Sequence, residues 1–142
     1  MQKSTARNRP VSSVPNVLAI DDEEVMGYLI QRIVRHLGYR VEWVTDCETA
    51  LRRIGEERFD VILSDFRIPA MGGEQLYFEI AKRDKRLLNR LVFVTGDTVS
   101  TRTAAFLRKH SVRFLSKPFD IQNLQDVIES IVQQPSAPPV CT

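Results

Sequence analysis

Short apolar segments alternate along the chain with longer segments in which apolar residues recur every three or four positions. The short segments have the length of buried strands, and the longer ones have the spacing of helices that bury one face. In residues 23–37, for example, apolar residues recur at helical spacing (Val25, Leu29, Ile30, Ile33, Val34 and Leu37), and Gly38 follows as a stop signal. We predict strands over residues 17–20, 40–44, 61–63, 91–94 and 112–115. We predict helices over residues 23–37, 46–57, 74–82, 101–109 and 121–132.

This regular alternation predicts an α/β fold. Strands that alternate with helices form a parallel sheet covered by helices on both faces. Connections between parallel strands are right-handed, which leaves few topologies. We therefore predict a flavodoxin-like, doubly wound, five-stranded parallel sheet of order 2-1-3-4-5 with five helices. Ligands of such sheets bind in the crevice outside the carboxyl ends of the strands.

Composition adds domain limits and excludes several classes of function. Residues 1–15 are polar, basic and punctuated by proline, so we expect a flexible arm or linker; residues 16–133 form one domain, and 134–142 a disordered Pro-rich tail. The net charge of +2 does not indicate direct nucleic-acid binding. No apolar run approaches the roughly 18 residues that span a bilayer, so we expect no membrane contact by this domain. Cys47 and Cys141 are far apart and lack the spacing of metal ligands. The sequence therefore shows no disulfide framework, which is typical of a protein in a reducing, cytoplasmic location.

Unusual polar residues follow the predicted strands. Asp21 and Asp22 follow the first strand, Asp65 the third, Thr95 the fourth and Lys117 the fifth. Clustered carboxylates repel one another unless a cation is present, and Mg²⁺ prefers oxygen ligands. A carboxylate beside such a cation can attack a phosphoryl group and form an acyl phosphate, while the hydroxyl and the ammonium hold the phosphoryl oxygens.

Each of these residues also has a simpler interpretation. Asp22 can cap the following helix, and Asp65 can be a turn acid before Pro69. Thr95 before Gly96 is typical of a turn, and an isolated lysine such as Lys117 is usually solvated. The chemical interpretation depends on all of the strand ends offering the required groups together.

Four segments resemble the motifs of response-regulator receiver (CheY-like) domains of two-component signalling. They are Ala19-Ile20-Asp21-Asp22-Glu23, Leu63-Ser64-Asp65 with Pro69 four residues later, Val94-Thr95-Gly96, and Ser116-Lys117-Pro118-Phe119. The resemblance covers residues 16–133 and implies that Asp65 is the phospho-acceptor of a phosphorelay. It implies that Asp22, Asp65 and the carbonyl of Arg67 ligate Mg²⁺ directly, with Asp21 acting largely through water.

The resemblance also implies a switch. Thr95 would bind the phosphoryl group and shift inward, Lys117 would pair with that group, and Phe114 would be the switching aromatic residue. We expect a cis peptide bond before Pro118 and a switch surface made of the fourth strand, the next helix, the fifth strand and the last helix. Two loop positions depart from the family pattern, Ile68 and Gly72, and neither supplies chemistry. Arg67, a long cation beside the acceptor, could steer phosphodonors or alter hydrolysis.

Three alternatives use similar chemistry or the same fold. A haloacid-dehalogenase-like phosphatase needs Asp-x-Asp, whereas this chain has Asp65-Phe66-Arg67. A flavodoxin-type cofactor binder needs a phosphate loop after the first strand, where this chain has four acids. A degenerate receiver, acting only as an interaction module, would not need the intact acids, Thr95 and Lys117. A receiver is not a conventional enzyme, since it catalyses only its own phosphorylation and dephosphorylation.

The expected partners are a cognate histidine kinase or a histidine phosphotransfer protein, and a second copy of this chain is a further candidate partner. With no output domain after the last predicted helix, function would come through a partner or a longer parent chain. The linker-like first 15 residues and the Pro-rich tail favour the terminal receiver of a hybrid sensor histidine kinase. Met1 favours a free-standing receiver instead.

Overall fold

The computed structural model describes residues 14–96 and 101–133. Most of the arm predicted over residues 1–15 and the whole tail predicted over residues 134–142 lie outside this part of the chain. Pro15 already belongs to the fold, because its carbonyl oxygen accepts a 2.9 Å hydrogen bond from the backbone N–H of Arg40.

The centre of the fold is one five-stranded sheet with the order β2-β1-β3-β4-β5, and all of its strand pairs are parallel. The strands are β1 (Asn16–Ile20), β2 (Arg40–Val44), β3 (Val61–Ser64), β4 (Leu91–Thr95) and β5 (Arg113–Ser116). Every residue of β1, β3 and β4 is buried, as expected for inner strands of a parallel sheet covered on both faces. The predicted fold class and strand order are confirmed.

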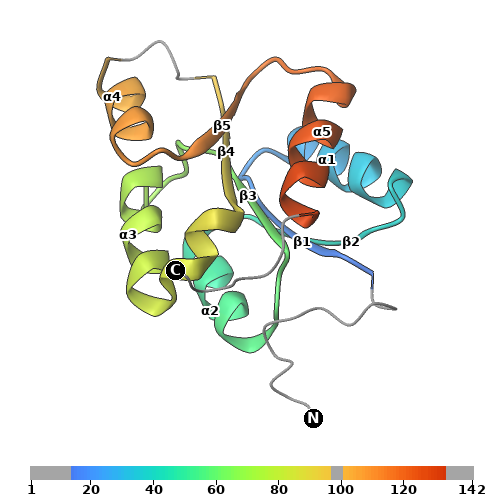
Figure 1. Cartoon of the computed structure of the whole chain (residues 1–142), viewed down its shortest axis with the longest axis horizontal. Coiled ribbons are helices and arrows are strands. Elements are labelled where there is room, and N and C mark those ends of the chain that lie inside the picture. Colours follow the sequence, from blue (N-terminus) through green and yellow to red (C-terminus); the bar gives the residue numbers. More distant parts are fainter. Residues whose placement is uncertain (1–13, 97–100, 134–142) are drawn as a thin grey trace.

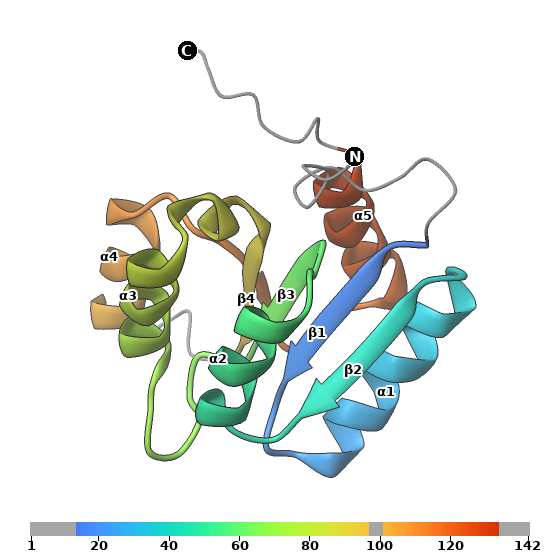
Figure 2. The ribbon, with the colours of Figure 1, turned by 90° about the horizontal axis from the view of Figure 1, so that it is seen from below.

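In the described residues, five α-helices cover the sheet: α1 (Glu24–His36), α2 (Cys47–Glu56), α3 (Gly73–Arg83), α4 (Thr101–Lys109) and α5 (Ile121–Val132). Helices α1 and α5 lie on one face of the sheet, and α2, α3 and α4 lie on the other (Figures 1 and 2). The sequence did not predict the additional 3₁₀ helix η2 (Lys85–Arg90). This helix is too short to show a helical repeat, and the side chain of Asp84 caps it by accepting from the N–H of Arg86.

Alternate residues of the inner strands point to the two faces and create two hydrophobic cores. Leu18 of β1 belongs to the core beneath α2, α3 and α4, whereas Ala19 belongs to the core beneath α1 and α5. Helices on both faces thereby hold the sheet rigidly, so that residues just beyond the strand ends occupy defined positions. In the described part of the chain, none of the helices has both the length and the apolar character that crossing a membrane requires.

Candidate functional site

The acids meet because β1 and β3 are adjacent and in register. Ile20 is paired with Ser64, and the N–H of Asp65 donates to the carbonyl of Ile20 at 3.0 Å. Asp21 and Asp65 therefore leave the sheet side by side, and Asp22 follows directly. One carboxylate oxygen from each of Asp21, Asp22 and Asp65 lies within 4.8 Å of the others.

The three carboxylates differ in exposure and in hydrogen bonding. Asp21 is only 1% exposed, and its Oδ1 accepts from the N–H of Glu23 at 2.9 Å. Asp65 is half-buried, and its Oδ1 accepts from the N–H of Arg67 at 3.1 Å. Asp22 is exposed. The cluster is thus open to solvent on the side of Asp22, where a ligand can enter.

Lys117 reaches this cluster from the end of β5. Its ammonium lies 3.1 Å from Oδ2 of Asp65, 3.4 Å from Oδ2 of Asp21 and 3.6 Å from Oε1 of Glu23. Its backbone N–H donates to the carbonyl of Thr95 at 3.0 Å, which ties the β5 end to the β4 end. One ammonium therefore faces three carboxylates, with Asp22 close by, and the site keeps an excess of negative charge.

Burial and the neighbouring charges shift two pKa values in the site. Burial raises the pKa of Asp21 above 3.8 and outweighs the opposing effects of the Glu23 N–H and of Lys117, while the charge of Asp65 raises it further. For Lys117, burial acts to lower the pKa, but the hydrogen bond and charge of Asp65, with Asp21 and Glu23, raise it above 10.5 overall. Lys117 is therefore charged at neutral pH.

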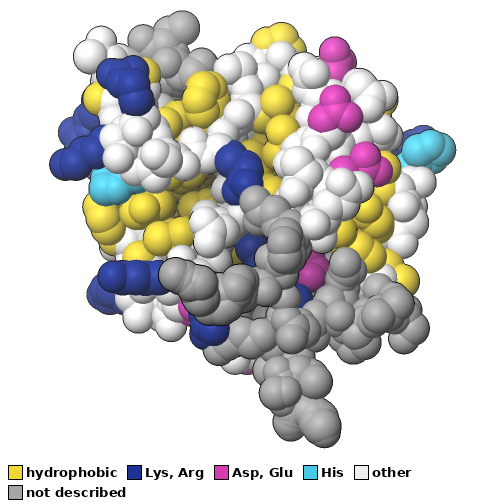
Figure 3. Space-filling view, in the orientation of Figure 1, with side chains coloured by type: hydrophobic (Ala, Val, Ile, Leu, Met, Phe, Trp, Pro, Cys, Tyr) yellow, Lys and Arg dark blue, Asp and Glu magenta, His cyan; other side chains and the backbone are white. Residues whose placement is uncertain are grey.

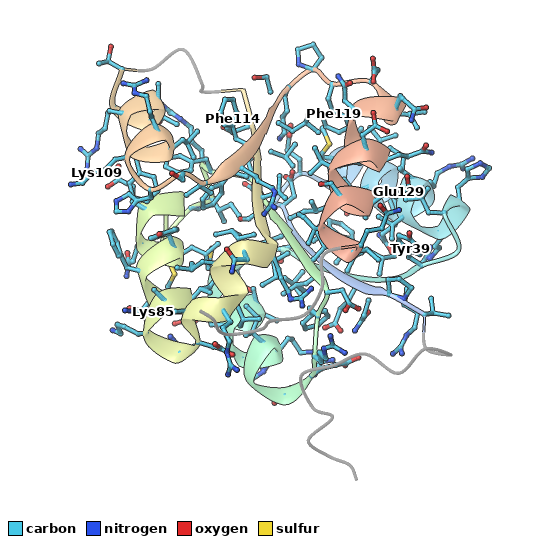
Figure 4. All side chains as sticks on the ribbon, in the orientation of Figure 1. Tyr39, Lys85, Lys109, Phe114, Phe119 and Glu129 are labelled. Carbon is cyan, nitrogen blue, oxygen red and sulfur yellow. The ribbon has the colours of Figure 1, made fainter. Side chains whose placement is uncertain are left out.

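The other predicted residues lie around this centre. Thr95 is buried at the end of β4, paired in register with Ser116 of β5. The peptide bond between Lys117 and Pro118 is cis. Phe114 lies on β5 (Figure 4) with 47% of its surface exposed.

The residues present suit a hard divalent cation. The cluster offers carboxylate oxygens and no thiol or imidazole, which is the donor set of Mg²⁺ rather than of zinc. The surplus of carboxylates over Lys117 supplies the charge that such a cation would neutralise.

Sequence reasoning missed one contact of this site. The indole N–H of Trp43 donates to the backbone carbonyl of Asp21 at 2.8 Å. A tryptophan in a predicted edge strand gives no sign of such a role, because the contact depends on how β2 lies against the end of β1.

Residues 17–129 match the family described as "Response regulator receiver domain". The chain belongs to this family. It is a receiver domain of two-component signalling, and its acidic pocket is consistent with Mg²⁺ binding and phosphoryl acceptance. None of the three alternative functions gains support from the site or from the relatives.

This receiver matches one relative over most of that relative's length and another over only a small part of it. It is 31% identical over 118 residues to the two-component response regulator ORR5 of Oryza sativa subsp. japonica, covering 81% of this chain and 88% of that one. It is 30% identical over 110 residues to the autoinducer 2 sensor kinase/phosphatase LuxQ of Vibrio vulnificus, covering 78% of this chain. The receiver spans only 13% of LuxQ.

Among solved structures, this receiver is similar to the receiver domain of a Pseudomonas aeruginosa sensor histidine kinase, with a TM-score of 0.77 and 27% identity. The likeness covers 86% of this chain and 100% of the other. That structure is described with a magnesium ion coordinated in its active site cleft.

Proposed function

We propose that Asp65 accepts a phosphoryl group from a phosphohistidine of a histidine kinase or of a histidine phosphotransfer protein. The observation that carries this proposal is the position of Asp65, whose carboxylate is 3.1 Å from the ammonium of Lys117 and grouped within 4.8 Å with those of Asp21 and Asp22. The described residues contain no second group of acids of this kind.

In the proposed reaction a carboxylate oxygen of Asp65 attacks the phosphorus atom. The bond from phosphorus to the donor imidazole breaks, its electron pair returns to that nitrogen, and an acyl phosphate forms on Asp65. Lys117 and the hydroxyl of Thr95 stabilise the charge on the phosphoryl oxygens. Bound Mg²⁺ would screen the repulsion between the acids and the incoming phosphoryl group.

The Mg²⁺ would be held by Asp22, Asp65 and the carbonyl of Arg67, with Asp21 acting mainly through water. The side chains of Asp22 and Asp65 contribute to the cluster directly. The backbone of Arg67 is held beside the acceptor by its hydrogen bond to Asp65. The relative from Pseudomonas aeruginosa, with its magnesium ion in the active site cleft, supports this assignment.

The phosphodonor would dock against the start of α1. Val25, Tyr28 and Leu29 share one face of this helix just after the acids and are 79%, 60% and 37% exposed. Adjacent exposed apolar side chains of this size mark interaction surfaces, and this patch borders the residues that a donor histidine must reach. A Val25→Ser variant should therefore slow transfer from a phosphorylated phosphotransfer protein but leave the reaction with acetyl phosphate unchanged.

Phosphorylation would switch the face formed by β4, α4, β5 and α5. We propose that Thr95 moves toward the phosphoryl group and that Phe114 turns inward from its half-exposed position. Hydrophobic side chains lie over β5 between α4 and α5 in the space-filling view (Figure 3), so this face could also pair two copies in a homodimer. Chemical-shift changes on adding beryllofluoride should spread to this face; changes confined to the neighbours of Asp22 and Asp65 would contradict the switch.

The deciding experiment is incubation with acetyl phosphate followed by mass spectrometry. We expect the protein to gain one phosphoryl group with Mg²⁺ and none with a chelator. The modification should map to the peptide that contains Asp65 and should disappear on treatment with hydroxylamine, which cleaves acyl phosphates. Modification on another peptide, or equal modification in the chelator, would refute the proposal.

We further propose a cytoplasmic location and a role as the terminal receiver of a hybrid sensor histidine kinase. The likeness to parts of two sensor kinases supports this arrangement, whereas the likeness to nearly all of ORR5 supports a free-standing receiver. The gene distinguishes them. An upstream open reading frame that encodes a phospho-accepting histidine and an ATP-binding domain would establish the hybrid kinase, and an in-frame stop codon directly upstream of Met1 would exclude it.

A further inference from the structure

The single tryptophan of the chain is built into the backbone that carries the acids. Asp21 lies beyond the end of β1, yet residues of β2 form hydrogen bonds with both its backbone N–H and its backbone carbonyl. Its N–H donates to the carbonyl of Val44 at 3.1 Å, and its carbonyl accepts from the indole of Trp43 at 2.8 Å. A side chain here extends the hydrogen bonding of the sheet by one peptide group past the last strand residue.

A glycine in α1 makes room for this indole. Gly27 is buried, and a Cβ atom at that position would overlap the ring atoms Cδ2, Cε2 and Cζ2 of Trp43. The ring of Tyr28 covers the indole from the next position, with ring centroids 5.9 Å apart. Glycine is unfavourable within a helix. At position 27 its missing side chain leaves the space in which the indole approaches the helix backbone.

The peptide group that Trp43 holds is the one that joins Asp21 to Asp22. Because a peptide group is planar, fixing the carbonyl of Asp21 also fixes the direction in which Asp22 leaves it. The described residues provide no hydrogen-bond partner for the side chain of Asp22, which is exposed. The backbone at Asp22 therefore sets the position from which its carboxylate extends.

We propose that Trp43 is a positioning residue that presents the acid pair to the metal, an inference that rests on the proposed Mg²⁺ site. Without the indole N–H, the peptide group between Asp21 and Asp22 can rotate, and the Asp22 carboxylate samples positions away from Asp65. Binding Mg²⁺ must then also restrict that motion, which weakens the affinity.

Calorimetric titration of the metal-free chain with Mg²⁺ tests this role directly. Trp43→Phe keeps an aromatic ring and removes the N–H, so we expect Mg²⁺ to bind between about twofold and tenfold more weakly, the effect of one hydrogen bond. The matched control is Val41→Ala, which trims the same core two residues earlier on β2 but does not touch Asp21. Equal loss in both variants, or wild-type affinity in Trp43→Phe, would overturn the proposal.

A second variant perturbs the indole from the other side. In Gly27→Ala the new methyl group should displace the indole, change the fluorescence emission of the single tryptophan and weaken Mg²⁺ binding as Trp43→Phe does. In a Trp43→Ala background the same Gly27→Ala change should no longer alter Mg²⁺ affinity. An undiminished effect there would contradict a role through Trp43. A wild-type chain that binds no Mg²⁺ would instead overturn the proposed function, and this inference with it.

Discussion

The amino and carboxyl ends of the sheet both bury an aspartate, but they surround it differently. Asp60, before β3, is 4% exposed; its carboxylate accepts from the N–H of Asn16 at 2.8 Å and lies 3.5 Å from the guanidinium of Arg58. Asp21, after β1, is 1% exposed and shares the ammonium of Lys117 with Asp65 and Glu23. Charge is balanced at the first end and is in excess at the second.

This difference shows how one sheet divides its tasks. Buried charges that are fully paired and hydrogen-bonded hold neighbouring segments in a fixed arrangement, and at the amino end Asp60 joins β1 to the loop before β3. An excess of carboxylates costs stability in the absence of a cation, but it leaves oxygen atoms to bind one. Substitutions at the two ends should therefore act on different properties.

The largest contrast is expected between Asp65→Asn and Asp60→Ala. Asp65→Asn removes the nucleophile, so incubation with acetyl phosphate should yield no phosphorylated protein by mass spectrometry. Asp60→Ala leaves the N–H of Asn16 buried without this acceptor, which should lower the free energy of unfolding by about 1–3 kcal/mol while phosphorylation proceeds at the wild-type rate. Loss of phosphorylation in Asp60→Ala would show that the two ends are not separable.

Lys117→Met should change two properties of the carboxyl end in opposite directions. Removal of one charge-stabilising donor should slow phosphorylation at saturating Mg²⁺ by about 100-fold, as measured by single-turnover mass spectrometry. Calorimetry should at the same time show tighter Mg²⁺ binding, because no ammonium competes for the acids. Lys85→Met is the control, since Lys85 lies on η2 outside the acid cluster (Figure 4) and should leave both values unchanged. Weaker Mg²⁺ binding in Lys117→Met would refute the competition.

Asp22→Asn should weaken Mg²⁺ binding and raise the stability of the metal-free protein. We expect calorimetry to show Mg²⁺ binding at least about tenfold more weakly. Loss of a residue that only hydrogen-bonds a metal ligand can already have an effect of this size, and Asp22 would be a ligand itself. In the metal-free protein the relief of repulsion should raise the free energy of unfolding in urea by up to about 1 kcal/mol, as for exposed charge pairs. Glu24→Gln, in the same acidic run but on the first turn of α1, should not raise it, because an acid there interacts favourably with the helix dipole. Equal results for the two variants would contradict a specific role of Asp22.

The smallest expected effect is a pH dependence of metal-free stability that comes from Asp21. Because burial raises its pKa in the folded protein above 3.8, the folded state holds this proton more tightly than the unfolded state. Stability should therefore fall as the pH rises from 3.8 through the raised pKa, relative to Asp21→Asn. Urea unfolding of both proteins in a chelator at a series of pH values measures the difference. A gap that stays constant, or that changes in the opposite direction, would show that burial does not control this group.

The strands and their order were predictable because apolar runs and helical spacing are local patterns. Even so, η2 was missed, since its helical hydrogen bonds and its Asp84 cap leave no periodic signal in six residues. The residues of the site were predictable by chemical type, because each directly follows or ends a strand. Trp43 was not, because its contact with Asp21 joins residues 22 positions apart on neighbouring elements.

The sequence alone determined the fold class, the strand order, and the groups that stand at the carboxyl ends of the strands, since each of these depends on short-range patterns and on general rules for parallel sheets. Only the tertiary structure decided how those groups share their charge. The register of β1 with β3 brings three carboxylates within 4.8 Å, and the end of β5 directs one ammonium at them. The burial of Asp21 and its hydrogen bond from the Trp43 indole depend on distances between segments remote in the chain. The same is true of the contrast between the two ends of the sheet, one with balanced charge and one with an excess of carboxylates. No local pattern encodes those distances.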